Sequence, residues 1–240
     1  MRLSTIVLKG FLTVTPLLLP ASHQFTGQPT PFLKKRPTPT FSPEEQERRF
    51  KDAFDTDLHV KGYRTGSHED LRLDRAKMRV RKNDSIYIDE NLTAQEKNSI
   101  ILHEYIHIKQ NEVIRKLKQE KLYEKRYDDQ EDIYAVFILE GSAEAGKHIA
   151  TNSHIKKEPD YTSLCRAREA GWQYHDDPRQ FYATGAAMVR PLIEKLGIEQ
   201  ALTGLLTTPP PNMSDFYTEE RRRDYLKRAE DNARNHFAKE

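Results

Sequence analysis

The chain has 240 residues, of which 36% are hydrophobic and 32% are charged. This composition is polar for a globular protein, but the length allows a buried core, in one larger domain or in two smaller lobes. The 39 basic and 37 acidic side chains are mixed along the chain and leave a net charge of +2, so nucleic acid and anionic membranes are not expected as partners. The single cysteine, Cys165, excludes an intrachain disulfide and zinc sites built on cysteine ligands.

The first 22 residues have the pattern of a secretory signal peptide. Arg2 and Lys9 precede an apolar run at residues 10–19, and the small residues Ala21 and Ser22 follow it. The run is too short for a comfortable membrane span, so a permanent anchor is the weaker alternative. We therefore expect an exported protein, secreted or held in the periplasm or at the cell surface, with no stable membrane span.

Residues 23–42 are rich in proline, threonine and basic side chains. Proline lacks a backbone donor and favours extended chain, which predicts a spacer or a short pro-segment, with a proline-rich recognition ligand as the alternative. Ser42 then offers a helix N-cap, Pro43 suits the first turn, and two acidic side chains follow. We expect a helix from Pro43 to about Phe54, where the folded part begins.

A short sheet is predicted in the next part of the chain. Glycines and scattered charges indicate loops at residues 60–73, whereas residues 78–81 and 86–89 alternate apolar and polar side chains around a turn at 82–85. This pattern predicts a hairpin. Its second strand ends a few residues before the helix described next, so we expect a strand edge to lie beside that helix.

The next helix carries the pentapeptide H-E-Y-I-H at residues 103–107. Thr93 and Glu96 form a predicted capping box, which starts the helix about ten residues before His103. The spacing of four places His103 and His107 on one face, where they can share one Zn²⁺, and Glu104 lies beside them, placed to hold a water molecule. An H-E-x-x-H match can occur by chance, so the zinc interpretation also depends on the predicted capped helix that carries it.

A second helix is predicted over residues 131–145, with Glu140 and Glu144 one turn apart on the same face. Glu140 is followed by the small residues Gly141, Ser142 and Ala143, which indicate a helix packed closely against another one. A carboxylate in that setting needs a compensating cation, and zinc is the obvious candidate.

H-E-Y-I-H followed by E-G-S-A-E at residues 140–144 resembles the gluzincin clan of zinc metallopeptidases. The resemblance extends to Y-A-T-G at 182–185, L-G-I at 196–198 and T-P-P-P-N-M-S-D-F at 208–216, which are similar to the C-terminal subdomain of many gluzincins. It covers about residues 79–225, and residues 1–78 match no family that we can name.

The resemblance implies a role for each residue of the two motifs. His103, His107 and Glu140 would be the ligands of Zn²⁺, and Glu104 would be the general base and proton shuttle. Glu144 would orient a ligand histidine without contacting the metal, and it is also the reserve candidate for the third ligand.

The clan also uses a tyrosine or histidine to stabilise the negative charge that develops on the carbonyl oxygen. Here the candidates are Tyr182, Tyr134, His148 and His154, and we take Tyr182 as the catalytic candidate.

The rest of the chain is predicted to be helical. Apolar residues recur at helical spacing over residues 181–196, and Gly197 can cap that helix, although Pro191 should bend it or start a new one. Residues 172–175 form an aromatic cluster suited to packing. The charged residues 219–240 predict an exposed final helix and tail.

The predicted fold class is α+β. We expect a predominantly helical zincin-like domain with a small sheet or hairpin before the H-E-x-x-H helix, divided into an N-terminal subdomain at 43–155 and a helical C-terminal subdomain at 156–240.

The predicted function is zinc-dependent hydrolysis of peptide bonds in a peptide or protein substrate, which could pair with the strand edge. The alternatives are a catalytically inactive zincin-fold protein used for binding or regulation, and a structural zinc site with four protein ligands.

Overall fold

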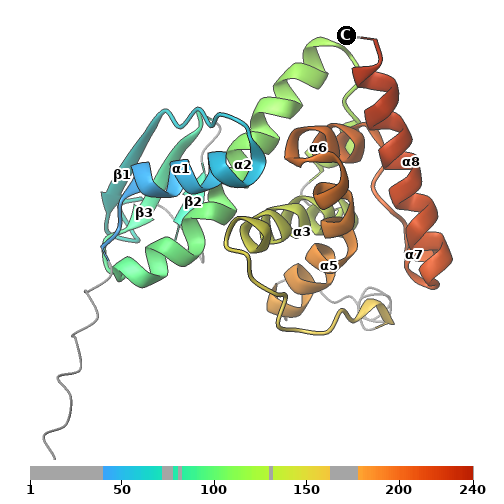
Figure 1. Ribbon diagram of the computed structural model, residues 1–240. Coiled ribbons are helices and arrows are strands. Elements are labelled where there is room, and N and C mark those ends of the chain that lie inside the picture. The colour runs from blue at the N-terminus through green and yellow to red at the C-terminus, as the bar shows by residue number, and fades with distance from the viewer. Residues whose placement is uncertain (1–39, 72–77, 81–82, 130–131, 163–177, 240) are drawn as a thin grey trace, which may run out of the picture. The chain divides into compact units, whose positions relative to one another are not determined.

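In the computed structural model, a small sheet and a larger set of helices lie on either side of one long helix, α2 (Figure 1). The structure describes residues 40–71, 78–80, 83–129, 132–162 and 178–239, which belong to one compact unit, Pro39–Glu240. The predicted signal peptide at 1–22, most of the proline-rich segment, Cys165 and the aromatic cluster at 172–175 lie outside the described residues. The predicted fold class, α+β and mainly helical, is confirmed.

The sheet has three strands in the order β1-β3-β2, with bounds β1 Gly62–Gly66, β2 Met78–Val80 and β3 Ser85–Asp89. β2 and β3 pair in antiparallel fashion, which confirms the predicted hairpin. β1 pairs in parallel with β3, so the prediction of loops at residues 60–73 was wrong at residues 62–66. Parallel pairing depends on a partner about twenty residues away, and β1, with a glycine at each end, carries too few apolar residues to show strand periodicity.

Helix α1, Pro43–Phe54, has the predicted bounds. The Ser42 hydroxyl accepts a hydrogen bond from the Glu45 N–H at 3.2 Å, as expected of an N-cap. On its inner face, the fully buried Phe50 packs edge-on against Tyr105 of α2, with ring centroids 6.0 Å apart. This contact fixes α1 against the middle of α2.

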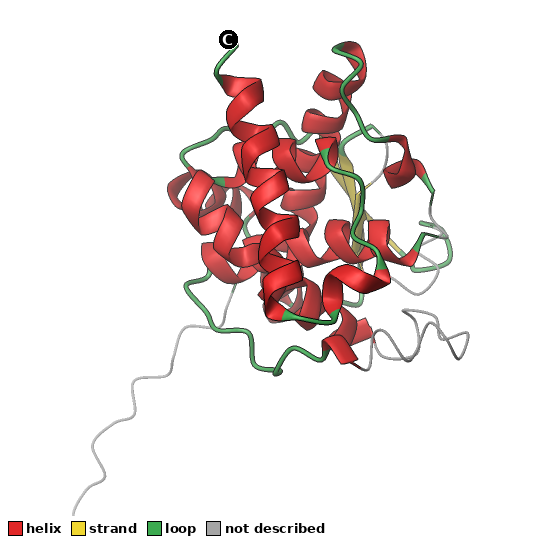
Figure 2. Ribbon diagram, turned by 90° about the vertical axis from the view of Figure 1, so that its right-hand side faces the viewer, coloured by secondary structure: helices red, strands yellow, loops and turns green. Residues whose placement is uncertain are grey.

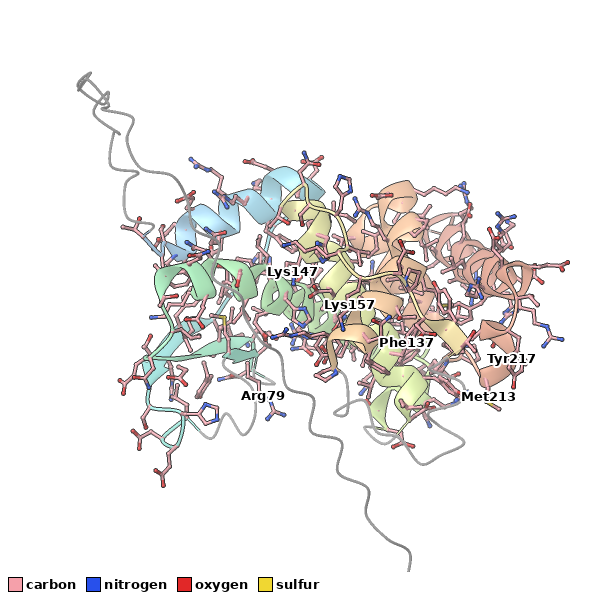
Figure 3. The ribbon with its side chains drawn as sticks, turned by 90° about the horizontal axis from the view of Figure 1, so that it is seen from below. Arg79, Phe137, Lys147, Lys157, Met213 and Tyr217 are labelled. Atoms are coloured by element: carbon pink, nitrogen blue, oxygen red, sulfur yellow. The ribbon has the colours of Figure 1, made fainter. Side chains whose placement is uncertain are left out.

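Helix α2, Ala94–Gln119, starts at the predicted capping box of Thr93 and Glu96. A short 3-10 turn, η1, follows at Lys125–Asp128. Helix α3 comes next, at Ile133–Ala150, and Asp132 is its N-cap. α2 packs against β2 on one side and against α3 on the other. In the view from below, Arg79 marks the sheet side, and Phe137 and Lys147 mark α3 (Figure 3).

The C-terminal helices are α5 (Pro178–Leu196), α6 (Ile198–Thr207), α7 (Met213–Phe216) and α8 (Glu219–Phe237). Seen from the α8 side, the helices lie in front of the sheet (Figure 2). Gly197, at φ 77°, ends α5 as predicted and also begins α6. Pro191 lies inside α5, so of the two effects expected there, a bend or the start of a new helix, the start of a new helix was wrong. Proline has no N–H, so the carbonyl four residues earlier loses its helical hydrogen bond. Pro191 is exposed, so water can bond to that carbonyl instead.

Close packing at two glycines holds α3 between α2 and α5. A Cβ added to Gly141 would lie 2.6 Å from the carbonyl carbon of Gly185 in α5, and one added to Gly146 would lie 2.4 Å from Ile106 in α2. At Gly141 the neighbour is backbone, so only glycine fits there, whereas at Gly146 the neighbour is the end of a side chain, which can shift. Glu140, next to Gly141, places its carboxylate 3.2 Å from His103 of α2. Among the described helices, none has the length and apolar character needed to cross a membrane.

Candidate metal centre

Three nitrogen and oxygen atoms from α2 and α3 converge at one point. His103 Nε2 lies 3.1 Å from His107 Nε2 and 3.2 Å from Glu140 Oε2, and His107 Nε2 lies 3.6 Å from the same oxygen. Ligand atoms around a tetrahedral zinc are about 3.3 Å apart, given bonds of about 2.0–2.1 Å. The donor set therefore fits a single zinc ion without rearrangement.

Electrostatics also favour a cation at this point. Burial alone would lower the pKa of His103, but its bonds to Glu140 and Glu144 outweigh that effect and raise the pKa to about 10. Burial would raise the pKa of Glu140, but the two imidazoles hold it well below its usual range. In the absence of a metal, a proton supplies the positive charge that these carboxylates require.

Glu144 lies behind His103, on the side of the ring away from the cluster. Its Oε2 is 3.3 Å from His103 Nδ1, and its Oε1 contacts Lys147 at 2.5 Å and His148 Nε2 at 3.1 Å. A carboxylate accepts, so Nδ1 of the neutral His103 ring carries the hydrogen and Nε2 presents its lone pair to the cluster. This placement suits the orienting role expected for Glu144 better than that of a reserve ligand.

Glu104 faces the sheet. It is 7% exposed, and its Oε2 accepts a hydrogen bond from the backbone N–H of Val80 at 3.0 Å. Burial raises the pKa of the Glu104 carboxyl, with the two imidazoles opposing the shift. The strand beside the cluster is thus β2, the first of the hairpin and an outer strand of the described sheet, whereas β3 is central.

The four candidates for stabilising carbonyl charge lie in different settings. The ring of Tyr182, on α5, is 5.9 Å from the ring of His103. Tyr134 is buried in the core, 5.4 Å from Phe216. His148 is bonded to Glu144, and His154 is exposed. Of the four, Tyr182 is the one that packs on a ligand candidate.

The sequence analysis missed two partners of the cluster. One is the backbone N–H of Val80, which every residue except proline has, so the type of side chain could not reveal this contact. The other is Gln110, whose Oε1 lies 2.7 Å from His107 Nδ1. Gln110 comes three residues after His107, so the helical spacing that paired the histidines could also have found it.

Comparison with known proteins assigns no family. No protein-family model matches the chain, and neither do any of the curated proteins or solved structures compared with it. The resemblance to gluzincins stays a prediction, which depends on the motifs at residues 103–107 and 140–144 and on the similar segments at 182–185, 196–198 and 208–216.

Proposed function

We propose that this protein is a zinc-dependent peptidase of the gluzincin type. The observation that carries the proposal is the convergence of His103 Nε2, His107 Nε2 and Glu140 Oε2 beside the buried carboxylate of Glu104. A solvated surface cluster would not place one carboxylate against two imidazoles while a second carboxylate is held by the backbone of a strand.

The number of donors favours a catalytic site over a structural one. Among the described residues, the cluster offers three donor atoms, one each from His103, His107 and Glu140. Structural zinc sites are closed by four protein ligands, whereas catalytic sites keep an open position. When bound there, zinc would lower the pKa of a coordinated water and polarise the scissile carbonyl.

Glu104 would move the proton. Its raised pKa suits a group that takes a proton from the attacking water and delivers it to the nitrogen of the leaving amine. The Val80 N–H holds Oε2, so we assign the proton transfer to Oε1. Tyr182 would donate a hydrogen bond to the carbonyl oxygen as negative charge develops on it.

The substrate would be an extended peptide. β2 is an outer strand of the described sheet and contacts Glu104 directly, so a peptide that pairs with it would pass the general base. Main-chain pairing gives affinity with little sequence selectivity. Residues 1–22 support export, so the proposed substrates are extracellular or periplasmic peptides and proteins.

The test compares wild type with Glu104→Gln and Glu90→Gln, each loaded with zinc. A mixture of unfolded proteins is the substrate, and cleavage is followed by mass spectrometry. Glu104→Gln should keep its zinc and lose activity by about 100- to 10,000-fold, as expected when a general base is removed. Glu90 is exposed, outside the cluster, so its variant should match wild type. Zinc-loaded wild type that cleaves nothing would contradict the proposal and favour an inactive binding protein.

A further inference from the structure

Gln110 connects the two helices that carry the three ligand candidates. It is 3% exposed and lies on α2, one turn after His107. Its Oε1 is 2.7 Å from His107 Nδ1, and its Nε2 is 2.7 Å from the Leu139 carbonyl oxygen and 2.8 Å from Ser142 Oγ, both on α3. One buried amide therefore bonds three groups.

The neighbours on α3 determine which way the amide faces. The Leu139 carbonyl can only accept a hydrogen bond. Ser142 donates its own hydroxyl hydrogen to that carbonyl at 3.0 Å, so its oxygen is left to accept. Both groups require the NH₂ end of Gln110, and the amide oxygen must therefore face His107.

The direction of the amide fixes the tautomer of His107. An amide oxygen cannot donate, so the bond between it and Nδ1 requires a hydrogen on Nδ1. In the neutral ring, Nε2 then has no hydrogen, and its lone pair faces His103 Nε2 and Glu140 Oε2. This is the tautomer that a metal ligand at Nε2 needs.

We infer that Gln110 is a positioning residue for the metal centre, which sets the tautomer of His107 and ties that ring to α3 beside Glu140. The inference rests on the proposed metal site, but it does not depend on peptidase activity. His103 is oriented by a carboxylate, Glu144, whereas His107 is oriented by a neutral amide. The two ligand histidines therefore have partners of different charge.

The competing role is packing alone, because Gln110 also holds α2 against α3. Two substitutions separate the roles. Gln110→Glu keeps an oxygen acceptor for His107 but loses both donors to α3, and Gln110→Ala loses all three bonds. Ser142→Ala is the matched control, since it removes one bond to α3 and leaves the bond to His107 intact.

Zinc affinity, measured by competition with a chromophoric chelator, is the first readout. Gln110→Ala should bind zinc about 10- to 100-fold more weakly than wild type, while Gln110→Glu and Ser142→Ala stay within about threefold. Thermal unfolding should show that Gln110→Glu and Gln110→Ala are both less stable. Equal losses of zinc affinity in these two variants would overturn the inference in favour of packing.

The second readout needs no metal. Long-range ¹H–¹⁵N spectra of the metal-free protein, at a pH where the ring is neutral, should show His107 protonated at Nδ1 in wild type and partly at Nε2 in Gln110→Ala. Identical spectra would overturn the inference. If wild type bound no zinc, the proposed function would fail, and these spectra would still decide the role of Gln110.

Discussion

The two sides of α2 fix the candidate site in different ways. On the α3 side, Gly141 brings the backbones of α3 and α5 into contact, and Glu140, Glu144 and Gln110 lie 2.7–3.3 Å from nitrogens of the two imidazoles. On the sheet side, Glu104 is held to a three-residue strand by the N–H of Val80. We therefore expect the proposed metal binding to depend on helix packing, and the position of the proposed base, Glu104, to depend on the sheet.

The largest effect is expected from replacing Glu140, the proposed metal ligand on the α3 side. Glu140→Ala should weaken zinc binding by more than about 100-fold, because one of three donors is lost, whereas Glu144→Ala should cost about 10- to 100-fold, as expected of an orienting partner. Metal content after dialysis and chelator competition measure both. If Glu140→Ala kept full zinc affinity and Glu144→Ala lost it, the assignment of the third ligand would be wrong.

Gly141→Ala should disturb the same side through packing. The new methyl group would lie 2.6 Å from the Gly185 backbone, so α3 and α5 must separate, at a cost of about 1–3 kcal/mol in the free energy of unfolding. Zinc affinity should fall too, because Glu140 is the adjacent residue.

Gly66→Ala is the matched change on the sheet side. There the added Cβ meets the Leu71 side chain at 3.3 Å, and that side chain can move. Chemical denaturation of both variants checks the comparison. A larger loss for Gly66→Ala than for Gly141→Ala would show that the α3 contact is not the tighter one.

Val80→Pro should disturb the contact between the sheet and Glu104 and leave the α3 side unchanged. Proline has no N–H to donate to Glu104 and is tolerated in outer strands, so activity should fall by about 10- to 100-fold, the value of one hydrogen bond to a charged group. Zinc affinity should stay unchanged. Val80→Ala keeps the N–H and should stay active, and a loss of zinc in Val80→Pro would show that the two sides are not independent.

Local patterns in the sequence predicted where the helices on both sides of α2 begin. They did not predict which distant residues these elements contact. Pro43 and the capping box of Thr93 and Glu96 mark helix starts through bonds within one turn, so α1 and α2 begin where expected. Glu140 stood out because small residues follow it. Strand β1 and the bond from Gln110 to Leu139, 29 residues away, arise from tertiary contacts that no local pattern records.

The smallest expected effect concerns the pH dependence of the metal-free protein. Bonds to Glu140 and Glu144 raise the pKa of His103 from its ordinary value of 6.5 to about 10. A group whose pKa is raised by folding stabilises the fold fully below its ordinary pKa, and this contribution is lost as the pH rises through the folded value. The metal-free protein should therefore lose thermal stability between about pH 6.5 and pH 10.

Zinc at the proposed site would reverse that dependence, because it would bind the neutral ring and displace the proton. Zinc affinity should fall as the pH is lowered, and titration calorimetry in two buffers of different ionisation enthalpy should detect proton release. Glu144→Gln removes one carboxylate from His103 and should release fewer protons at the same pH. If wild type released no protons, or if Glu144→Gln released as many as wild type, His103 would not be kept protonated by the carboxylates of α3.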